Sequence, residues 1–545
     1  MSKQSYKRVA ISGLLWKFGE RFLAQFVSTV VSIILARILF PEDYAVVALT
    51  TIFINVLNVF ITQGFGGALI QKKNPDDLDF SSAFYSSLAI SIALYVGLFF
   101  AAPYIASWFG TEQLGPILRV IGLQLPISAF GSIQVSYISK NFLFKKFFLA
   151  TLVGTLISAV VGIAMAYMGY GPWALVAQHM TNLIIDRFVL FLTIKWRPKW
   201  MFSWKRTKGL LNYGWKLLIS GLVDVGYNEV RSVIIGKKYT PTDLAYYNKG
   251  KSLPAMVGDN LNAPINAVLF PVMSAEQNDK NRLKHMTRKS ITTSVYVLSP
   301  LLIGLAVVSP VLVPVLFTDK WNEMIPYLQI MAALYIFHPI HTANLQAIKA
   351  IGRSDLFLVL EIIKKAVGIA ILLATMWFGA LWIAIGMLIG TVLSTIINAF
   401  PNKKLLNYGW GEQMLDILPY LGLAILMGAP VYAMNYLYLS LGWNMYLVLV
   451  LQILAGIIIY VGSSMLFKVE IFKYLLDAIK DFFKKRKKKP ETSEGVETKE
   501  EVVEEIKETA TANENIAEET VLGDTPQEET EQSKIEEETE DKENK

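Results

Sequence analysis

The chain has 545 residues, of which 53% are hydrophobic and only 17% are charged. This composition excludes an ordinary soluble protein, because many apolar runs exceed the ~20 residues that a helix needs to cross a bilayer. The net charge of +7 does not indicate a nucleic-acid partner, and none is expected, since the basic residues are spread over short loops. The absence of cysteine excludes disulfides and thiolate metal sites.

Hydropathy and helix-breaking residues predict an all-α polytopic membrane protein with about fourteen transmembrane helices. In chain order the predicted spans cover residues 12–38, 44–70, 81–108, 114–139, 147–168, 172–194, 209–236, 246–273, 290–317, 325–350, 356–378, 380–400, 414–438 and 442–467. The eighth span is the most polar. We retain it because the basic loops at 195–208 and 276–289 can both be cytosolic only if an even number of spans separates them.

Two segments roughly 200 residues apart share one pattern, which is typical of transporters built from repeated bundles. The first contains Trp16, Lys17, Arg37, Pro41, Asp43 and Ala45, and the second contains Trp215, Lys216, Lys237, Pro241, Asp243 and Ala245. The repeat predicts two pseudo-symmetric six-helix bundles, at 1–205 and 206–404, followed by helices 13 and 14 at 405–467. Bundles of this kind face each other across a central cavity.

Charge predicts the orientation of the chain and the nature of its C-terminal part. The basic residues gather in alternate loops, which places both termini in the cytosol. Residues 468–489 predict an amphipathic, polybasic helix lying on anionic lipid, with a solvated stop signal as the alternative. Between residues 491 and 545 there are 21 acidic and 5 basic residues. The segment 490–545 is therefore predicted to be a disordered acidic tail.

Polar side chains form a stripe along one face of three predicted spans. The stripe of span 1 contains Lys17, Arg21, Gln25, Ser28 and Ser32; that of span 7 contains Lys216, Ser220, Asp224, Asn228 and Arg231; that of span 8 contains Lys251, Asp259, Asn262 and Asn266. Ionisable groups are costly inside a membrane and usually face a cavity or a partner. The stripes thus predict one wet cavity, although ordinary ion pairs and snorkelling at the interface could explain single residues.

The stripes also indicate the kind of substrate. Arginine binds phosphate with a planar fork and lysine binds it as a point charge, whereas amides provide donors and acceptors for sugar hydroxyls. An anionic, sugar-bearing substrate fits this mixture better than a lipophilic cation. The sequence contains no Walker loop, no convincing metal site and no paired catalytic carboxylates in an extramembrane domain. We therefore expect no enzyme activity, no cofactor and no metal.

Several strings resemble the polysaccharide-transporter family of oligosaccharide flippases, which belongs to the superfamily of multidrug, oligosaccharidyl-lipid and polysaccharide exporters. They are ARILFPEDYAVVAL (36–49), GFGGALIQKKN (64–74), DFSSAFY (79–85), YYNKGKSL (246–253), APINAVLFPVMSAEQND (263–279) and AIGRSDLFLVLEIIKK (350–365). The resemblance covers roughly residues 5–470. It implies a bacterial inner-membrane protein that flips undecaprenyl-pyrophosphate-linked oligosaccharides by alternating access for lipopolysaccharide or exopolysaccharide synthesis.

The resemblance also implies roles for the polar stripes. The pyrophosphate should meet cations on spans 1 and 8, here Lys17, Arg21, Lys249 and Lys251, and our mechanism adds Arg231. Gln25, Asn228, Asn262 and Asn266 would contact the sugar, and Asp224, Glu229 or Asp259 would bind a coupling cation. A polysaccharide polymerase or assembly protein is a candidate partner. The alternative function is a cation-coupled drug or metabolite exporter of the same superfamily; a membrane glycosyltransferase fits least well.

Overall fold

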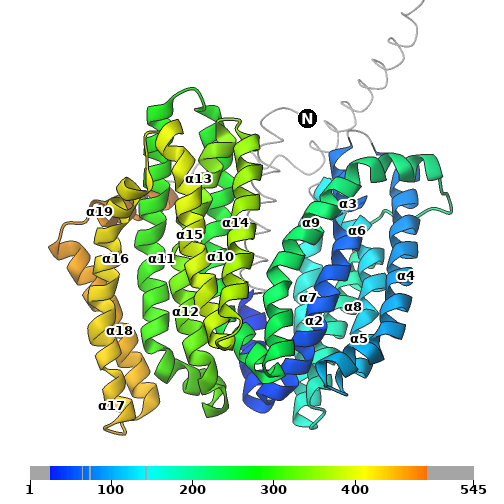
Figure 1. The fold of residues 1–545 in the computed structure, drawn as a ribbon, viewed down its shortest axis with the longest axis horizontal. Helices are drawn as coiled ribbons and strands as arrows, with labels where there is room; N and C mark the ends of the chain where they lie inside the picture. Colours follow the sequence, from blue (N-terminus) through cyan, green and yellow to red (C-terminus); the bar gives the residue numbers. More distant parts are fainter. Residues whose placement is uncertain (1–24, 64, 73–74, 141–143, 488–545) are drawn as a thin grey trace, which may run out of the picture. The chain divides into compact units, whose positions relative to one another are not determined.

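The computed structural model describes residues 25–63, 65–72, 75–140 and 144–487, and every regular element within them is a helix (Figure 1). The described residues up to Lys473 form one compact unit, and those from Tyr474 onward belong to a second. The prediction of an all-α membrane protein is confirmed. Nine helices of the described residues are long and apolar enough to cross a membrane. The number fourteen stays a prediction.

The N-terminal half begins with an apolar helix at Gln25–Ile38. It continues with α2 (Pro41–Thr62), α3 (Phe65–Gln71), α4 (Asp77–Phe109), α5 (Leu114–Gly122), α6 (Gln124–Lys140), α7 (Phe144–Tyr167) and α8 (Pro172–Thr193). The predicted second span is divided into α2 and α3. The predicted fourth span is divided into α5 and α6 at Leu123, where Gly122 and Pro126 weaken a continuous helix.

The C-terminal half begins with two long helices, α9 and α10. Its elements are α9 (Trp204–Lys238), α10 (Pro241–Ala275), α11 (Lys280–Phe317), η1 (Asp319–Met324), α12 (Ile325–Ile336), α13 (His338–Ala350), α14 (Ser354–Thr375), α15 (Ala380–Leu405), α16 (Trp410–Ala433), α17 (Asn435–Leu439), α18 (Met445–Leu466) and α19 (Glu470–Lys487). The polar eighth span is one continuous helix of 35 residues, α10. The predicted tenth span is divided into α12 and α13, beside Pro339.

The repeated Pro-x-Asp pattern begins a helix in both halves. Pro41 is the first residue of α2, and Asp43 accepts a hydrogen bond of 2.9 Å from the backbone nitrogen of Phe40. Pro241 is the first residue of α10, and Asp243 and Thr240 bond each other's backbone nitrogens at 3.1 Å. Proline is tolerated in the first turn of a helix, and the aspartate side chain accepts a hydrogen bond from a backbone N–H group at the helix start. Both copies therefore make the same tight reversal between two helices, at what we call the hairpin end.

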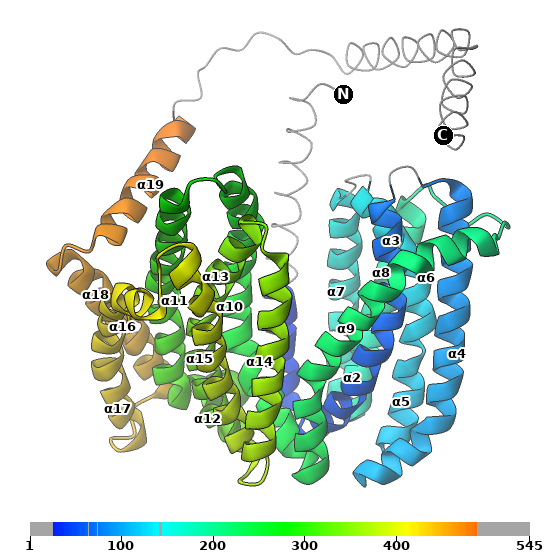
Figure 2. The same cartoon turned by 45° about the horizontal axis from the view of Figure 1, so that its top comes forward.

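Helix α9 packs along α2, and both views show the two helices side by side (Figure 1, Figure 2). A Cβ added to Gly236 would lie 2.5 Å from Leu49, and one added to Gly221 would lie 2.9 Å from Val59. Small residues allow such close approach in membranes, where lipid is as apolar as the helix surface and packing must drive association. The glycines thus fix α9 against the N-terminal half.

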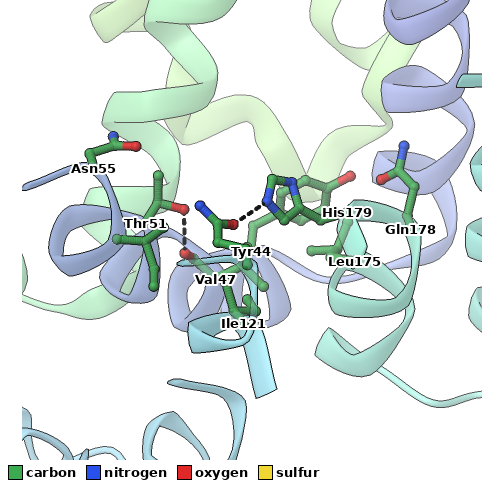
Figure 3. A pocket seen from close by; sticks show the side chains of 10 residues that line it. Tyr44, Val47, Thr51, Asn55, Ile121, Leu175, Gln178 and His179 are labelled. Carbon is green, nitrogen blue, oxygen red and sulfur yellow. Dashed lines mark hydrogen bonds between the residues drawn. The ribbon is translucent and has the colours of Figure 1, made fainter. Parts of the chain in front are cut away.

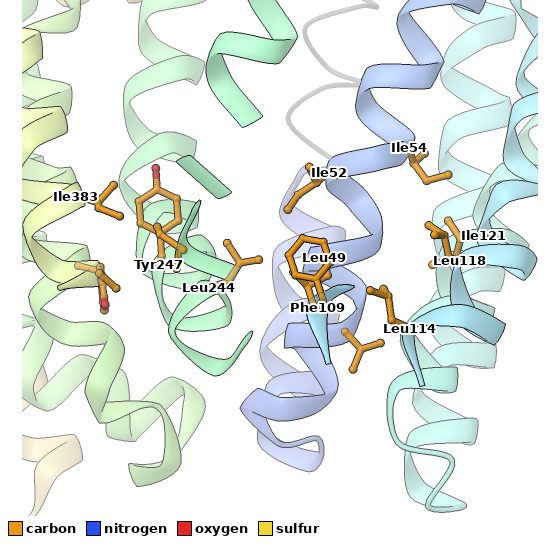
Figure 4. Close-up of a cluster of buried hydrophobic side chains, with 14 of the residues drawn as sticks. Leu49, Ile52, Ile54, Phe109, Leu114, Leu118, Ile121, Leu244, Tyr247 and Ile383 are labelled. Atoms are coloured by element: carbon orange, nitrogen blue, oxygen red, sulfur yellow. The ribbon is translucent and has the colours of Figure 1, made fainter. Parts of the chain in front are cut away.

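A large cluster of buried apolar side chains joins the two halves near the hairpin end. Leu49, Phe109 and Leu118 of the N-terminal half contribute to the same cluster as Leu244 and Tyr247 of α10 (Figure 4). Tyr239 also bridges to the turn before α15, donating to the carbonyl of Met376 at 2.6 Å and accepting from Gly379 at 2.9 Å. These contacts position α9 and α10, which carry most of the predicted site residues that the structure describes.

Candidate functional site

The helix at residues 25–38 meets α10 and η1 along a contact that we call the seam. The amine of Lys249 donates to the hydroxyl of Ser32 at 2.8 Å and to its carbonyl at 3.3 Å. Trp321 donates to the carbonyl of Ala36 at 2.8 Å, and Lys320 donates to that of Arg37 at 2.9 Å. Because these partners are more than 200 residues apart in the chain, the seam joins the two halves.

Lys249 is enclosed at the seam. It is 7% exposed, and its amine lies 4.8 Å from the ring of Tyr44, 4.9 Å from that of Phe317 and 5.6 Å from that of Trp321. Aromatic faces attract a cation most strongly where water is excluded. Three rings and a serine therefore account for this buried charge without a substrate.

Arg231 and Lys251, which we call the cation pair, have different surroundings. Arg231 is also 7% exposed. Among the described residues its guanidinium bonds only within its own helix, to the carbonyl of Tyr227 at 3.2 Å and to the Tyr227 hydroxyl at 3.0 Å. Lys251 is half-buried and makes no hydrogen bond or ion pair with the described part of the chain. It lies within electrostatic range of Arg231, Glu229 and Asp259. Two cations without a carboxylate bound to them are suited to receive an anion.

Each predicted coupling carboxylate contacts a side chain on another helix. Asp224 of α9 lies 3.2 Å from the amine of Lys365 in α14. Glu229 of α9 accepts a hydrogen bond of 2.8 Å from Asn55 in α2. Asp259 of α10 lies 3.9 Å from His338 at the start of α13. The three carboxylates therefore connect α9 and α10 to α2, α13 and α14.

The predicted sugar-binding amides are distributed over three helices. Asn262 donates to the hydroxyl of Thr342 at 2.9 Å, and its buried carbonyl oxygen has no partner among the described residues. Asn228 is exposed on α9, and Gln25 is half-buried at the start of the described chain. Asn266 belongs to α10, but its side chain is outside the described part, as are Lys17 and Arg21 as whole residues.

Two polar connections were not predicted in this form. Glu361, Lys364 and Lys365 suggest a local ion-pair set, and the 2.6 Å contact of Lys364 with Glu361 confirms part of it. Lys365 instead reaches Asp224. Lys364 also lies 3.4 Å from His341, which contacts Asn398 at 2.6 Å. Helical spacing places such residues on a face, but only the fold determines the opposing helix. Among the described residues no group of three potential ligands could hold a metal.

Comparison with known proteins identifies the family. The family model described as "Polysaccharide biosynthesis protein" matches residues 34–326. The succinoglycan biosynthesis transport protein ExoT of Rhizobium meliloti is 24% identical over 55% of this chain, which spans 60% of that relative. The lipopolysaccharide biosynthesis protein WzxC of Escherichia coli is 22% identical over 76% of this chain and 86% of the relative. The teichuronic acid biosynthesis protein TuaB of Bacillus subtilis is 23% identical over 55% of this chain and 62% of the relative.

Solved structures share the fold. The lipid II flippase MurJ in an inward closed conformation matches with a TM-score of 0.67 at 17% identity, over 84% of this chain and 100% of that one. An inward-facing multidrug resistance transporter of the MATE family matches with a TM-score of 0.54 at 15% identity, over 70% of this chain and 94% of that one. At these identities the similarity establishes a common multi-span transporter fold and nothing finer.

Proposed function

This chain belongs to the polysaccharide biosynthesis protein family, and from that premise we propose that it flips an undecaprenyl-pyrophosphate-linked oligosaccharide across the bacterial cytoplasmic membrane. The observation that carries the proposal is the cation pair. Arg231 and Lys251 come from adjoining helices and have no carboxylate bound to them among the described residues. A pyrophosphate would bind the pair directly, with Arg231 offering a planar fork and Lys251 a mobile amine.

The other predicted residues take roles around this pair. Lys17 and Arg21 would add positive charge from the first span, and Gln25, Asn228, Asn262 and Asn266 would meet sugar hydroxyls. Lys249 differs, because Ser32 and three rings already hold it. In our proposal Lys249 stabilises the seam when the headgroup is bound, and the polyprenyl chain stays in the lipid.

Transport requires the two halves to change their contacts. In the proposal Asp224, Glu229 or Asp259 exchanges its present partner, respectively Lys365, Asn55 or His338, for a coupling cation. Each exchange would release one helix from its neighbour. Binding of the cation would then favour one of the two conformations of the transporter over the other. The sequence has no loop for ATP hydrolysis, so a cation gradient or substrate removal would give the direction.

The surroundings of the protein are part of the same proposal. The basic ends of the helices and both termini would lie in the cytosol. The predicted interfacial segment coincides with α19, an amphipathic helix that ends at Lys487. Its basic end would rest on anionic lipid, and a polysaccharide polymerase would receive the flipped unit. Drug export, the alternative suggested by the shared fold, is disfavoured by a cation pair that would repel a lipophilic cation.

The direct test reconstitutes the protein in vesicles and measures flipping of lipid-linked oligosaccharide extracted from the producing cells. We expect Arg231→Ala and Lys251→Ala to abolish flipping while both proteins still insert. Lys208→Ala, which removes an exposed charge near the start of α9, is the matched control and should retain activity. Full activity of both test variants, or flipping of the extract equally well by empty vesicles, would refute the proposal.

A further inference from the structure

A cavity of about 210 Å³ lies within the N-terminal half, and none of the predicted site residues that the structure describes lines it. We call it the amide cavity. Its walls come from α2, α5, α6 and α8, and they consist of Tyr44, Val47, Thr51, Ile54, Asn55, Ile121, Gln124, Leu175, Gln178 and His179. It is partly open, and Thr51, Asn55 and His179 of its lining are exposed; Figure 3 shows how the lining side chains lie.

The described residues of its walls contain many neutral hydrogen-bonding groups but no charged side chain. His179 contacts the carbonyl oxygen of the Gln124 amide at 2.6 Å. Because that oxygen can only accept, His179 donates through Nε2 and its Nδ1 is left as an acceptor. The amide nitrogen of Gln124 and the side chain of Gln178 have no partner in the described part of the chain.

The hydroxyl of Tyr44, one of the lining residues, has an unused hydrogen-bonding capacity. It is buried and has no hydrogen-bond partner among the described residues. A buried polar group without a partner costs roughly 1–3 kcal/mol, so a native protein usually supplies one. Figure 3 shows Tyr44, His179 and Gln178 around the same space, with Leu175 beside them.

From these observations we infer that the amide cavity binds an uncharged sugar ring of the transported oligosaccharide, an inference that rests on the proposed function. Amides and hydroxyls match the hydroxyls of a sugar, while Val47, Ile54, Ile121 and Leu175 match its C–H face. The absence of a lining cation excludes the pyrophosphate, and the absence of a carboxylate excludes a metal ion. The volume is below the ~300 Å³ of the smallest drug-sized pockets, so one ring fits rather than a whole oligosaccharide.

The cavity is connected to both halves through its rim. The ring of Tyr44 lies 5.1 Å from that of Trp321 and 4.8 Å from the amine of Lys249, so it is part of the seam. Asn55 donates to Glu229, one of the predicted coupling carboxylates. A sugar bound at Tyr44 and Asn55 would therefore contact the residues through which the halves meet. This arrangement would allow the glycan, and not only the pyrophosphate, to influence the change between conformations.

The test compares two probes on purified protein. They are the undecaprenyl-pyrophosphate-linked oligosaccharide fraction from the producing cells and undecaprenyl pyrophosphate without sugar. Tyr44→Phe removes one hydroxyl but keeps the ring at the seam, and Gln178→Leu removes one amide. Each should weaken binding of the oligosaccharide-linked probe about three- to tenfold, the value of one or two neutral hydrogen bonds, and leave the other probe unchanged. Tyr104→Phe on the exposed face of α4 should change neither.

A labelling experiment adds an independent measurement. The chain has no cysteine, so Thr51→Cys introduces a single thiol at the cavity mouth. The oligosaccharide-linked probe should slow its reaction with a maleimide, and undecaprenyl pyrophosphate should not. Equal weakening of both probes by Tyr44→Phe, no weakening of either, or an unprotected thiol would overturn the inference and leave the proposed function intact. Failure of the unmodified protein to bind either probe would instead refute the proposed function.

Discussion

Two buried cations on adjoining helices, Lys249 of α10 and Arg231 of α9, are equally buried but differently surrounded. Lys249 bonds to Ser32 of another helix and is enclosed by three rings. Within the part of the chain that the structure describes, Arg231 bonds only to Tyr227, four residues away on its own helix. A buried charge is costly unless the fold compensates it. The comparison teaches that a charge in a membrane span indicates binding when no other helix has already compensated it.

Replacement of Arg231 by methionine should have the largest effect. If it has none, the contrast between Arg231 and Lys249 is wrong. We expect binding of undecaprenyl pyrophosphate to weaken by about 30-fold or more, equivalent to roughly 2 kcal/mol for a lost buried charge contact. Thermal stability should rise, because a buried charge that no other described helix binds is replaced by an apolar side chain. Affinity and melting temperature of the same purified sample test both statements. A lower melting temperature with unchanged affinity would show that Arg231 is structural.

Replacement of Lys249 by methionine should have the opposite pattern. The variant keeps the volume but loses a charged hydrogen bond and the attraction of three rings, so we expect a loss of about 2 kcal/mol in stability. Affinity for undecaprenyl pyrophosphate should stay the same. Thermal unfolding in detergent measures the first effect, and the binding assay measures the second. Reduced affinity at full stability would return Lys249 to the headgroup site.

The contact between Asp224 and Lys365 should have a smaller effect, because Asp224 is mostly exposed. Ion pairs of this kind contribute roughly 0.2–1 kcal/mol. In a double-mutant cycle with Asp224→Asn and Lys365→Met, we expect a coupling of about two- to fivefold in the flipping rate. The exposed pair Arg353 and Asp355, at the start of α14, provides the control cycle. Additive effects of the two single changes would show that this contact between α9 and α14 does not take part in transport.

The sequence predicted the helices better than it predicted their neighbours. Pro41 and Pro241 mark the same reversal because an N-terminal proline with an aspartate two residues later has a local physical cause. The polar faces of α9 and α10 follow from helical spacing, which is also local. Lys249 could not be assigned in this way. Its partner Ser32 is 217 residues away, and nothing in the residues around Lys249 specifies that helix.

The amide cavity illustrates the same limit more strongly. Asn55, Gln124 and His179 lie on three different helices, and none of them belongs to a polar stripe of the kind found on α9 and α10. A single amide in a span has an ordinary explanation, a hydrogen bond to a neighbouring helix. Only the packing of α2, α6 and α8 brings the three together around one space. Charge and periodicity therefore predict a polar stripe along one helix, but they do not predict a site to which several helices each contribute one or two residues.

The smallest effect is expected at Asp355, near the start of α14 and outside the predicted span. Three hydrogen bonds from Arg353, at 2.7, 2.9 and 3.2 Å, lower the pKa of Asp355 from 3.8 to about 2. A carboxyl whose pKa is lowered on folding contributes stability above its unfolded pKa, and this contribution is lost as the pH falls toward 2. Because both side chains are exposed, water and salt screen the pair. Asp355→Asn should therefore leave the melting temperature and the flipping rate unchanged between pH 5 and 8. A measurable loss of either would mean that charges at the membrane surface contribute more to stability or transport than charges compensated within the membrane.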